Sequence, residues 1–366
     1  SVHREACYCE RSEQQPSILS IPIYMPKNIV KSASLAYNIH TNPKEVLYKM
    51  KDTKHKILTL AALTTIAAGV IHLTNRVIVA SSQLKEMLDF SNHNYYNWRF
   101  GKIYYTKKGK GSPLLLIHDT MPGASGYEWS RVEDQLAQEH TVYTLDLLGC
   151  GRSEKAGITY TNFLFVQIIC DFIKNVIKEK TDIIASGFSC SFVTTAAAYD
   201  KESINKIMFI NPVSMISLAQ TTTKKDKLFK FFIELPIFGT FIYHIIVSRE
   251  TINDFFLDKL YYNPFHVDKD VLDAYYEAAH KGGYYAKCLY SSQSAKYMNI
   301  NIRHAVESID NSIYIVEGED EPNGAAIVEA YQKVNPAIES ATIPCSKHFP
   351  HIENVGAFLE QVGAFF

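Results

Sequence analysis

The chain has 366 residues, of which 47% are hydrophobic and 12% are aromatic. This length can hold one large α/β domain with additions, and this composition provides a substantial core and is unlike that of a disordered chain. The net charge of −1 gives no reason to expect nucleic acid or any other strongly charged partner.

The N-terminal part differs in composition from the rest. Residues 1–49 contain scattered Pro, Ser and Asn without sustained periodicity, so we expect a poorly structured extension. Met50 is followed by lysines at positions 51, 54 and 56 and then by the apolar run Ile57 to Leu73. A cationic flank before an apolar run is typical of a signal peptide or a signal anchor. The pattern favours a natural chain start at Met50.

This apolar run is about 17 residues long, which is short for a membrane span, although Val77 to Ala80 extend it. Three interpretations are open: a single membrane anchor, a buried or interfacial helix of the globular domain, and a cleaved signal. We favour the first, with residues 50–90 as an anchor helix and linker and the rest of the chain on the outer side of the membrane. The expected location is therefore a membrane, and the alternative is the cytoplasm.

From residue 91 onward, apolar strands alternate with helices. Pro113 to Ile117 is continuously apolar, which indicates a strand buried on both faces, as in a parallel sheet. The expected elements of this part are a hairpin over 97–105, strands over 113–117, 141–145 and 181–184, and helices over 128–139 and 163–178. This alternation predicts a mostly parallel, doubly wound sheet with right-handed crossovers.

The alternation is interrupted after a strand predicted over 204–211. Residues 221–304 hold aromatic-rich helical stretches with few strand signals, as expected for a helical insertion over the carboxyl ends of a parallel sheet. Strands over 312–316 and 339–343 and helices over 325–334 and 355–366 complete the pattern. We therefore expect a core in two parts, residues 91–214 and 307–366, with a helical lid over residues 215–306 inserted after the sixth strand.

Ser189 lies between the strand over 181–184 and a helix that starts near Val193. A strand, a sharp turn of small residues and a helix form the context in which a G-x-S-x-G match indicates a nucleophile. Gly187 provides the first small residue, and Ser191 stands where the pattern has its second glycine. The alternative interpretation is a serine-rich loop without chemistry.

A catalytic serine needs a base within hydrogen-bond reach and an acid that orients the base. The strand ending at Val316 runs into the sequence EGEDEP at 317–322, and CSKHFPHIE at 345–353 follows the last predicted strand. With these motifs, the chain from Trp98 to Phe366 resembles the α/β-hydrolase superfamily. Within it, the chain is most similar to the lid-bearing branch of esterases, haloalkane-dehalogenase-like and epoxide-hydrolase-like proteins. The resemblance implies the α/β-hydrolase fold, here preceded by the N-terminal hydrophobic helix.

The resemblance also implies roles for individual residues. Glu321 occupies the position of the acid, with Asp320 as the alternative, and His348 occupies the position of the base. Backbone N–H groups of Cys190 and Thr120 would form the oxyanion hole. The chain departs from the family pattern at Asp119, Ser191, Glu321 and Lys347.

The nucleophile distinguishes the branches of this family. An aspartate would imply dehalogenase or epoxide-hydrolase chemistry, whereas Ser189 points to acyl transfer. We therefore expect a serine hydrolase that cleaves an ester or related acyl bond of a small apolar substrate, without a metal or organic cofactor. The alternatives are a C–C bond hydrolase or perhydrolase using the same triad, and a catalytically inactive, membrane-tethered protein that works by binding. The seven cysteines lack metal-ligand spacing and a disulfide framework, so we expect free thiols.

Overall fold

The computed structural model describes residues 43–88 and 94–366. The chain divides into two units, residues 1–60 and 61–366, and helix α1 (Pro43–Ser82) begins in the first and continues into the second. Residues 43–49 are therefore helical, although the sequence predicted a poorly structured extension up to residue 49. The remainder of that extension, residues 1–42, lies outside the described residues.

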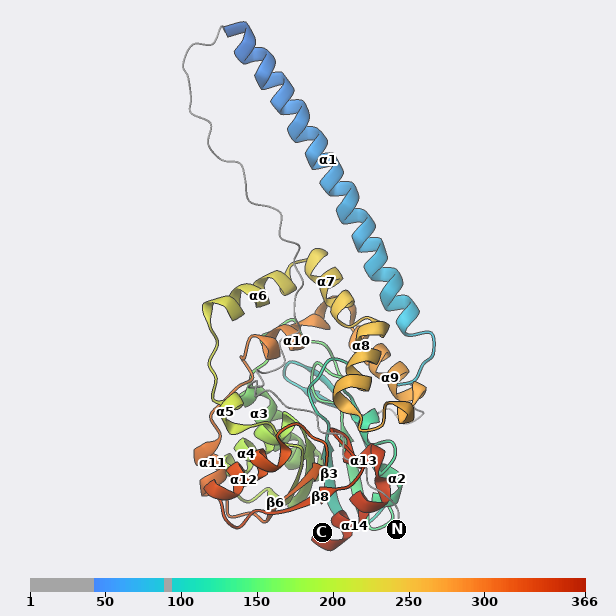
Figure 1. Cartoon of the computed structure of the whole chain (residues 1–366), viewed down its shortest axis with the longest axis vertical. Helices are drawn as coiled ribbons and strands as arrows, with labels where there is room; N and C mark the ends of the chain where they lie inside the picture. Colours follow the sequence, from blue (N-terminus) through green and yellow to red (C-terminus); the bar gives the residue numbers. More distant parts are fainter. Residues whose placement is uncertain (1–42, 89–93) are drawn as a thin grey trace, which may run out of the picture. The chain divides into compact units, whose positions relative to one another are not determined.

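A mixed sheet of eight strands forms the centre of the second unit, in the order β1-β2-β4-β3-β5-β6-β7-β8 (Figure 1). The pairs β1–β2 and β2–β4 are antiparallel, and the remaining neighbours are parallel. The strands are β1 (Asn94–Trp98), β2 (Gly101–Lys108), β3 (Ser112–Ile117), β4 (His140–Leu145), β5 (Thr181–Ser186), β6 (Ile204–Ile210), β7 (Ile313–Gly318) and β8 (Glu339–Ile343). The predicted hairpin followed by a mostly parallel sheet is confirmed.

Helices cover both faces of this sheet because successive side chains of a strand point to opposite faces. In β3, Leu115 and Ile117 belong to one buried core, and Leu114 and Leu116 belong to the other. The first core includes side chains of α3 (Asn162–Phe172), α4 (Ser189–Tyr199), α11 (Arg303–Ser308) and α12 (Gly324–Val334). The second includes side chains of α2 (Glu133–Leu136) and α14 (Val355–Phe365). The continuous hydrophobicity of β3 thus reflects burial on both faces.

Two predicted helices differ from the observed ones. The helix expected over 128–139 is broken into a 3-10 turn (Gly126–Trp129) and the short α2. The buried Glu133 carboxylate accepts hydrogen bonds from the hydroxyls of Thr106 at 2.6 Å and Thr144 at 2.7 Å, which holds this segment against β2 and β4. The helix expected over 163–178 is α3, which ends in a π-helical turn (Ile173–Ile177).

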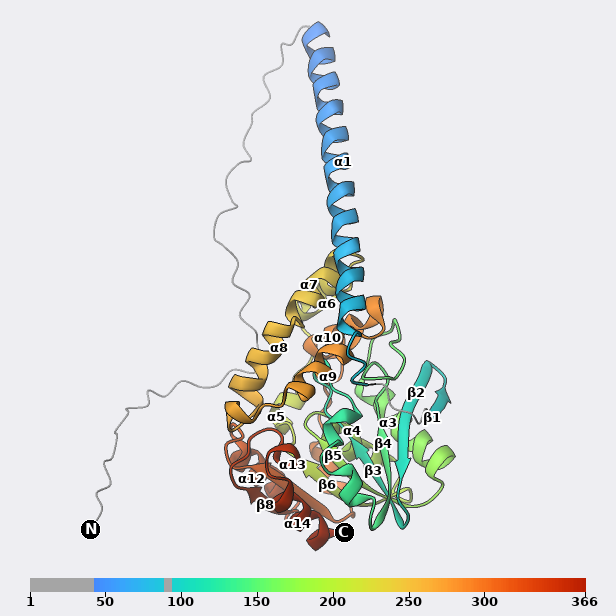
Figure 2. The ribbon, with the colours of Figure 1, turned by 90° about the vertical axis from the view of Figure 1, so that its right-hand side faces the viewer.

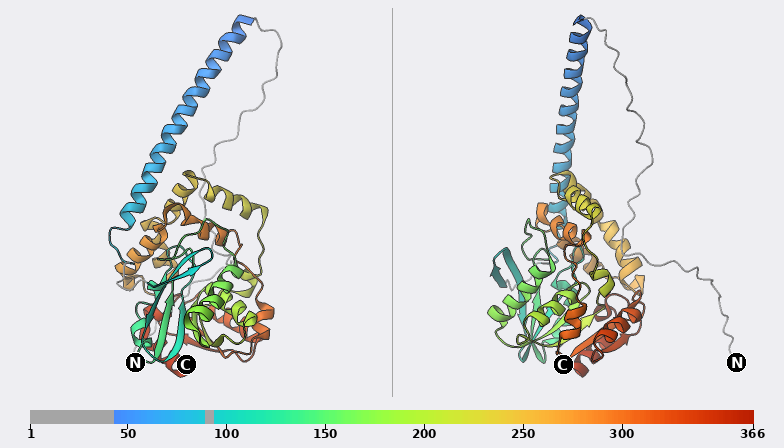
Figure 3. Two further views of the ribbon diagram at one scale, coloured as in Figure 1. Left: turned by 180° about the vertical axis from the view of Figure 1, so that it is seen from behind. Right: turned by 90° about the vertical axis from the view of Figure 1, so that its left-hand side faces the viewer.

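The insertion between β6 and β7 is helical, as predicted. It contains α5 (Met215–Leu218), α6 (Lys224–Glu234), α7 (Phe238–Ile246), α8 (Arg249–Phe255), α9 (Lys269–His280) and α10 (Lys287–Ser294). Helices α6 to α10 gather at the end of the sheet opposite the C-terminus of the chain (Figures 2 and 3). The parallel strands present their carboxyl ends there, so the lid covers the loops that follow β3, β5, β7 and β8.

Helix α1 contains a segment that is long and apolar enough to cross a membrane, Asp52–Ser82, with a mean hydropathy of 1.9. Most of its large apolar side chains from Ile57 to Leu73 are exposed, and Ile71 is half-buried. From Asn75 onward the helix contacts the lid, because the buried Asn75 amide donates to the carbonyl oxygen of Ile237 at 3.0 Å. Lys85, just beyond the helix, forms an ion pair with the buried Asp273 of α9.

Candidate active site

The site lies at the carboxyl edge of the sheet, where the loops after β3, β5, β7 and β8 meet. β3 pairs with β5, and the last residue of β3, Ile117, is in register with Ala185 near the end of β5. The loop that begins at His118 therefore lies beside the turn that begins at Gly187. β7 pairs with β8 on the other side of β6, which brings the loops of the predicted acid and histidine to the same edge.

The sharp turn after β5 is made by Gly187. This residue follows the last strand residue, Ser186, and has a φ of +55°, in the left-handed region that favours glycine. Phe188 already has helical dihedral angles, and Ser189 is the first residue of α4. A nucleophile elbow carries its nucleophile on the sharp turn itself. In this chain the residue on that turn is Gly187, which lies two residues before Ser189 and has no side chain.

Ser189 does not contact the predicted base. Its side chain is fully buried, and its hydroxyl donates to the carbonyl oxygen of His118 at 2.6 Å. Within the described residues, no hydrogen bond joins it to His348, whose ring nitrogens face other groups. The sequence expectation of a Ser189–His348 contact therefore differs from the observed arrangement, because the turn and the start of α4 place the Ser189 hydroxyl against the loop after β3.

The carboxylate of Asp119 occupies the space in front of Gly187. A Cβ atom added to Gly187 would lie 2.4 Å from the Asp119 carboxyl carbon. Asp119 Oδ1 accepts hydrogen bonds from the backbone N–H of Phe188 at 2.8 Å and from that of Thr120 at 2.6 Å. Asp119 Oδ2 lies 3.5 Å from Nε2 of His348. The sequence identified Asp119 only as a departure from a glycine pattern and missed this position of its side chain.

His348 lies between two carboxylates. Its Nδ1 is 3.3 Å from both Oε1 and Oε2 of Glu321, and its Nε2 faces Asp119. Burial would lower the pKa of His348, but the adjacent carboxylates of Glu321 and Asp119 outweigh it and raise that pKa well above its ordinary value. Asp320, the alternative acid, is exposed on the same loop. The structure therefore brings Glu321, rather than Asp320, to the histidine.

The two backbone donors at the site are those of Phe188 and Thr120. Thr120 was predicted, whereas the second predicted donor, Cys190, has its N–H directed at the carbonyl oxygen of Gly187 at 3.4 Å within the turn. Because the turn lies at Gly187, the residue after it is Phe188, and this is the N–H that points toward the site. The thiol of Cys190 is buried and donates to the carbonyl oxygen of Ala185 at 3.3 Å.

Asn211, at the end of β6, holds the histidine loop in place. Its amide donates to the carbonyl oxygens of Lys347 at 2.8 Å and His348 at 2.9 Å, and its Oδ1 accepts from the N–H of Gly318 at 3.0 Å. A Cβ atom on Gly318 would lie 1.9 Å from the Lys347 carbonyl oxygen, so this close approach requires glycine. The lid also contributes, because the N–H of His348 donates to the carbonyl oxygen of Leu260 at 3.0 Å.

A second acid–histidine pair lies behind Asp119. Glu128 is buried, and its Oε2 accepts from the backbone N–H of Asp119 at 3.2 Å. Its Oε1 is 3.5 Å from Nε2 of His351, whose ring stacks on Trp129 with ring centres 4.7 Å apart. The sequence motifs did not identify Glu128. This pair supports the loop that carries Asp119.

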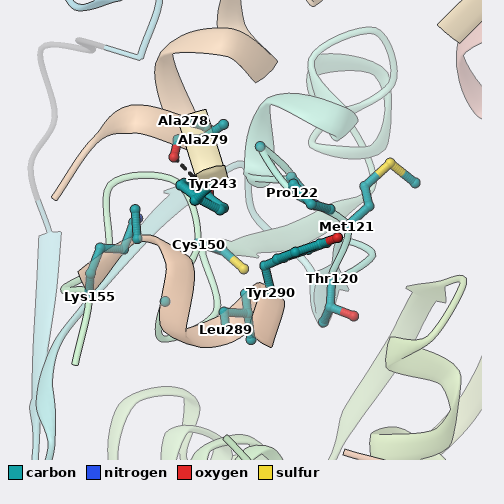
Figure 4. Close-up of a pocket in the computed structure, with 14 residues that line it drawn as sticks. Thr120, Met121, Pro122, Cys150, Lys155, Tyr243, Ala278, Ala279, Leu289 and Tyr290 are labelled. Atoms are coloured by element: carbon teal, nitrogen blue, oxygen red, sulfur yellow. Dashed lines mark hydrogen bonds between the residues drawn. The ribbon is translucent and has the colours of Figure 1, made fainter. Parts of the chain in front are cut away.

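A small cavity lies beside Thr120, between the loop after β3 and the lid (Figure 4). Its walls are mostly apolar, and the hydroxyl of Tyr243 donates to the Ala279 carbonyl oxygen at 2.8 Å across one side. The buried Lys155 lines it, and burial lowers the pKa of this lysine to about 8. The residues that line the cavity are Thr120, Met121, Pro122, Gly123, Ala124, Gly149, Cys150, Lys155, Tyr243, Ala278, Ala279, Ala286, Leu289 and Tyr290. Across residues 52–88 and 94–366, whose side chains the structure describes, no cluster of His, Cys, Asp and Glu has the arrangement of a metal site.

A protein-family model described as "Alpha/beta hydrolase family" matches residues 114–361. The chain belongs to this family. It is 28% identical over 114 residues to a 2-hydroxy-6-oxo-6-(2'-aminophenyl)hexa-2,4-dienoic acid hydrolase of Metapseudomonas resinovorans, covering 31% of this chain and 39% of that protein. It is 29% identical over 109 residues to a soluble epoxide hydrolase of Corynebacterium sp. (strain C12), covering 30% of this chain and 37% of that protein.

These matches thus span about two fifths of each relative. Among solved structures, a serine hydrolase involved in carbazole degradation is similar, with a TM-score of 0.61 and 18% identity over 75% of this chain and 98% of that one. A membrane phospholipase A has a TM-score of 0.59 and 16% identity, over 85% and 97% of the two chains. At these identities, the structural similarity establishes the α/β-hydrolase fold.

Proposed function

We propose that the protein is a hydrolase in which His348 is the general base and Glu321 the acid that orients it. The observation that carries this proposal is the position of Glu321, with both carboxylate oxygens 3.3 Å from Nδ1, which leaves Nε2 directed toward the turn after β5. In family members a histidine held in this way transfers protons between a nucleophile or water and the leaving group. Asn211 fixes the loop that carries it.

The apolar lining beside the site supports a small and largely apolar substrate, for which the cavity must widen, because its volume of about 10 Å³ holds only about one water molecule. The cavity beside Thr120 is lined mainly by aliphatic and aromatic side chains, and its polar groups come from Thr120, Lys155, Tyr243 and Tyr290. Pockets of this kind bind apolar ligands and use a few polar groups for orientation.

An ester or related acyl bond cleaved through Ser189 is one form of this function. It is supported by the serine in the strand-to-helix segment and by the similarity, 33% identity over 67 residues, to a pimeloyl-[acyl-carrier protein] methyl ester esterase of Aliivibrio fischeri (strain ATCC 700601 / ES114). It requires two rearrangements of the observed site. Ser189 must leave the carbonyl oxygen of His118, and Asp119 must release the N–H groups of Phe188 and Thr120 so that a substrate oxyanion can bind there. A C–C bond hydrolase or perhydrolase using Ser189 has the same requirements.

The central experiment compares the wild type with His348→Gln on panels of p-nitrophenyl esters, terminal epoxides and 1-haloalkanes. We expect the substitution to reduce hydrolysis of any substrate that the wild type cleaves by at least about 100-fold, since general base catalysis contributes roughly 10²–10⁴-fold. Unchanged hydrolysis in the folded variant would refute the role of His348. No turnover on any panel would favour the inactive, binding form of the protein.

A fluorophosphonate probe tests the serine form separately. Labelling of the wild type that disappears in Ser189→Ala would support acyl transfer through Ser189. Labelling that survives this substitution, or no labelling at all, would contradict it.

We also propose that α1 anchors the protein in a membrane. The exposed apolar segment from Ile57 to Leu73 supports this proposal, because it would otherwise place a long apolar surface in water. Its length of about 26 Å, at roughly 1.5 Å per residue, is slightly less than a hydrocarbon core of roughly 30 Å. The residues that follow, from Asn75, contact the lid and would place it near the membrane surface.

A further inference from the structure

We propose that the nucleophile of this protein is the carboxylate of Asp119, supplied by the loop after β3, and that it attacks a saturated electrophilic carbon, as in an epoxide or an alkyl halide. This proposal rests on the function proposed above only for the role of His348 as the base. It replaces acyl transfer through Ser189 by an alkyl-transfer mechanism.

The first argument is positional. The turn after β5, which carries the nucleophile in an elbow, is occupied here by Gly187, and the space where its side chain would project contains the Asp119 carboxylate. The carboxyl carbon and both oxygens of Asp119 lie within 2.4 to 2.7 Å of the point where a Cβ would stand. A side chain at position 187 and the observed position of Asp119 therefore exclude one another. The missing side chain of Gly187 thus leaves the space that the Asp119 carboxylate fills.

The second argument comes from the two oxygens of the carboxylate, which have different surroundings. Oδ1 accepts both backbone N–H groups, those of Phe188 and Thr120, which lie where a family oxyanion hole is formed. Among the described residues, no backbone N–H donates to Oδ2, which makes a longer contact with Nε2 of His348 at 3.5 Å. Oδ1 is thus held by two amides, whereas Oδ2 is held only by the longer contact with His348 and is the oxygen that can attack a substrate.

The third argument is that a filled oxyanion hole suits alkyl transfer and opposes acyl transfer. Acyl transfer needs free N–H donors for the carbonyl oxygen of the substrate. Attack on a saturated carbon needs none, because the charge then develops on the leaving group. The N–H donors become useful later, when the enzyme ester is hydrolysed and the charge develops on Asp119 itself.

The reaction proceeds in two balanced steps. In the first, Oδ2 of Asp119 forms a bond to the substrate carbon, and the bond from that carbon to its leaving group breaks. The leaving group departs with the electron pair as a halide, or as an epoxide oxygen that takes a proton from water. The product of this step is an alkyl ester of Asp119.

In the second step, Nε2 of His348 takes a proton from water while the water oxygen attacks the Asp119 carboxyl carbon. The N–H groups of Phe188 and Thr120 stabilise the oxyanion on Oδ1. The intermediate collapses, and the alkyl–oxygen group leaves with the proton that His348 carries. The released alcohol contains the former Oδ2, and the water oxygen remains in the Asp119 carboxyl group. The proton left on that carboxyl group passes to Nε2 of His348, which restores the starting pair of a charged Asp119 and a protonated His348.

The charge state of His348 agrees with this order of steps. The two carboxylates raise the pKa of His348, so its ring is protonated before the reaction, when Asp119 carries its charge. A protonated ring cannot take a proton from a serine. Formation of the ester removes the charge of Asp119, which lowers the pKa of His348 and allows it to lose its proton and act as the base.

The experiment uses the full chain with His348→Gln, which should form the ester but not hydrolyse it. After incubation with terminal aliphatic epoxides and 1-haloalkanes, intact-protein mass spectrometry should find one added alkyl group, and peptide mapping should place it on Asp119. His348→Gln combined with Asp119→Asn should show no adduct. The matched carboxyl control, Asp254→Asn on the exposed surface of α8, should retain the adduct when combined with His348→Gln.

Each result bears on one of the two proposals. An adduct that persists without the Asp119 carboxylate, or no adduct from any compound of the panel, overturns the role of Asp119. A His348→Gln variant that turns over the panel as fast as the wild type overturns the role of His348 instead. A single turnover of the wild type in ¹⁸O-labelled water should place the label in Asp119 and leave the alcohol unlabelled. Label found only in the alcohol would also overturn the proposal.

Discussion

Exchanging the side chains at positions 187 and 119 gives a sharp test of how this site is built. Gly187→Ser alone places a Cβ 2.4 Å from the Asp119 carboxyl carbon. It also forces a side chain into a left-handed conformation, which costs about 1–2 kcal/mol. Displaced Asp119 loses two charge-assisted hydrogen bonds, each worth roughly 1.5–3 kcal/mol. The single substitution should therefore reduce the free energy of unfolding by about 4–8 kcal/mol.

Asp119→Gly alone removes the two hydrogen bonds but creates no clash. When it is combined with Gly187→Ser, the clash is absent, so the double variant should be more stable than the sum of the two single effects predicts. Both single variants lose the same two hydrogen bonds, so their coupling should be about 3–6 kcal/mol, at or above the range of about 0.5–3 kcal/mol that is typical of residues in contact. Urea unfolding followed by tryptophan fluorescence measures the free energy of unfolding of the wild type, the two single variants and the double variant. The signal reports on unfolding because Trp98 and Trp129 are both buried.

The double variant should also gain a new reactivity. A serine on the turn would face Nε2 of His348, and the N–H groups of Phe188 and Thr120 would be free to stabilise an oxyanion. We expect a fluorophosphonate probe to label the double variant at position 187. Additive stability effects, or labelling at Ser189 in the folded double variant, would refute the assignment of the elbow to position 187.

Three further outcomes are expected. Asp119→Asn should lower the pKa of His348 toward its ordinary value of 6.5, measured by NMR titration of the imidazole, because one of the two carboxylates beside it is lost; an unchanged pKa would contradict their contact. Arg152→Met should reduce the free energy of unfolding by about 3–5 kcal/mol, because it leaves the buried Asp146 carboxylate without its charge partner. Equal urea midpoints for wild type and Arg152→Met at pH 7 would contradict this loss of stability. Arg152 overcomes the effect of burial and lowers the pKa of Asp146 from 3.8 to about 2. The stability from this pair is therefore complete above pH 3.8 and is lost as the pH falls toward 2. Ile66→Asp, near the centre of the exposed apolar segment of α1, should shift the protein from the membrane pellet to the soluble fraction, because a central charge costs roughly 2.5–3.5 kcal/mol in a span. An unchanged distribution would count against the anchor.

Local patterns in the sequence were sufficient for most of the architecture. The apolar run from Leu114 to Ile117 predicted a strand buried on both faces, because only such a strand lacks polar positions. The aromatic-rich helical stretch after the sixth strand predicted the lid. The order of the loops after β7 and β8 also predicted the pairing of Glu321 with His348, because parallel neighbouring strands bring their carboxyl ends to the same edge.

Other features depended on contacts between distant residues. The helix expected over 128–139 is divided in two, since Glu133 forms hydrogen bonds with Thr106 and Thr144 on strands that a helical periodicity does not reveal. Asn211 could not be recognised as the residue that holds the histidine loop, because its partners at Gly318 and Lys347 are more than 100 residues away in the sequence.

The position of the turn after β5 could not be read from spacing alone. Small residues recur at every second position from Ala185 to Ser191, so the spacing of a G-x-S-x-G motif fits a turn centred on either Gly187 or Ser189. The sequence by itself determined the strand, the helix and the presence of a sharp turn between them. The tertiary structure decided which residue makes that turn, because Gly187 can adopt a positive φ without strain and β3 places Asp119 in the space that a side chain there would need.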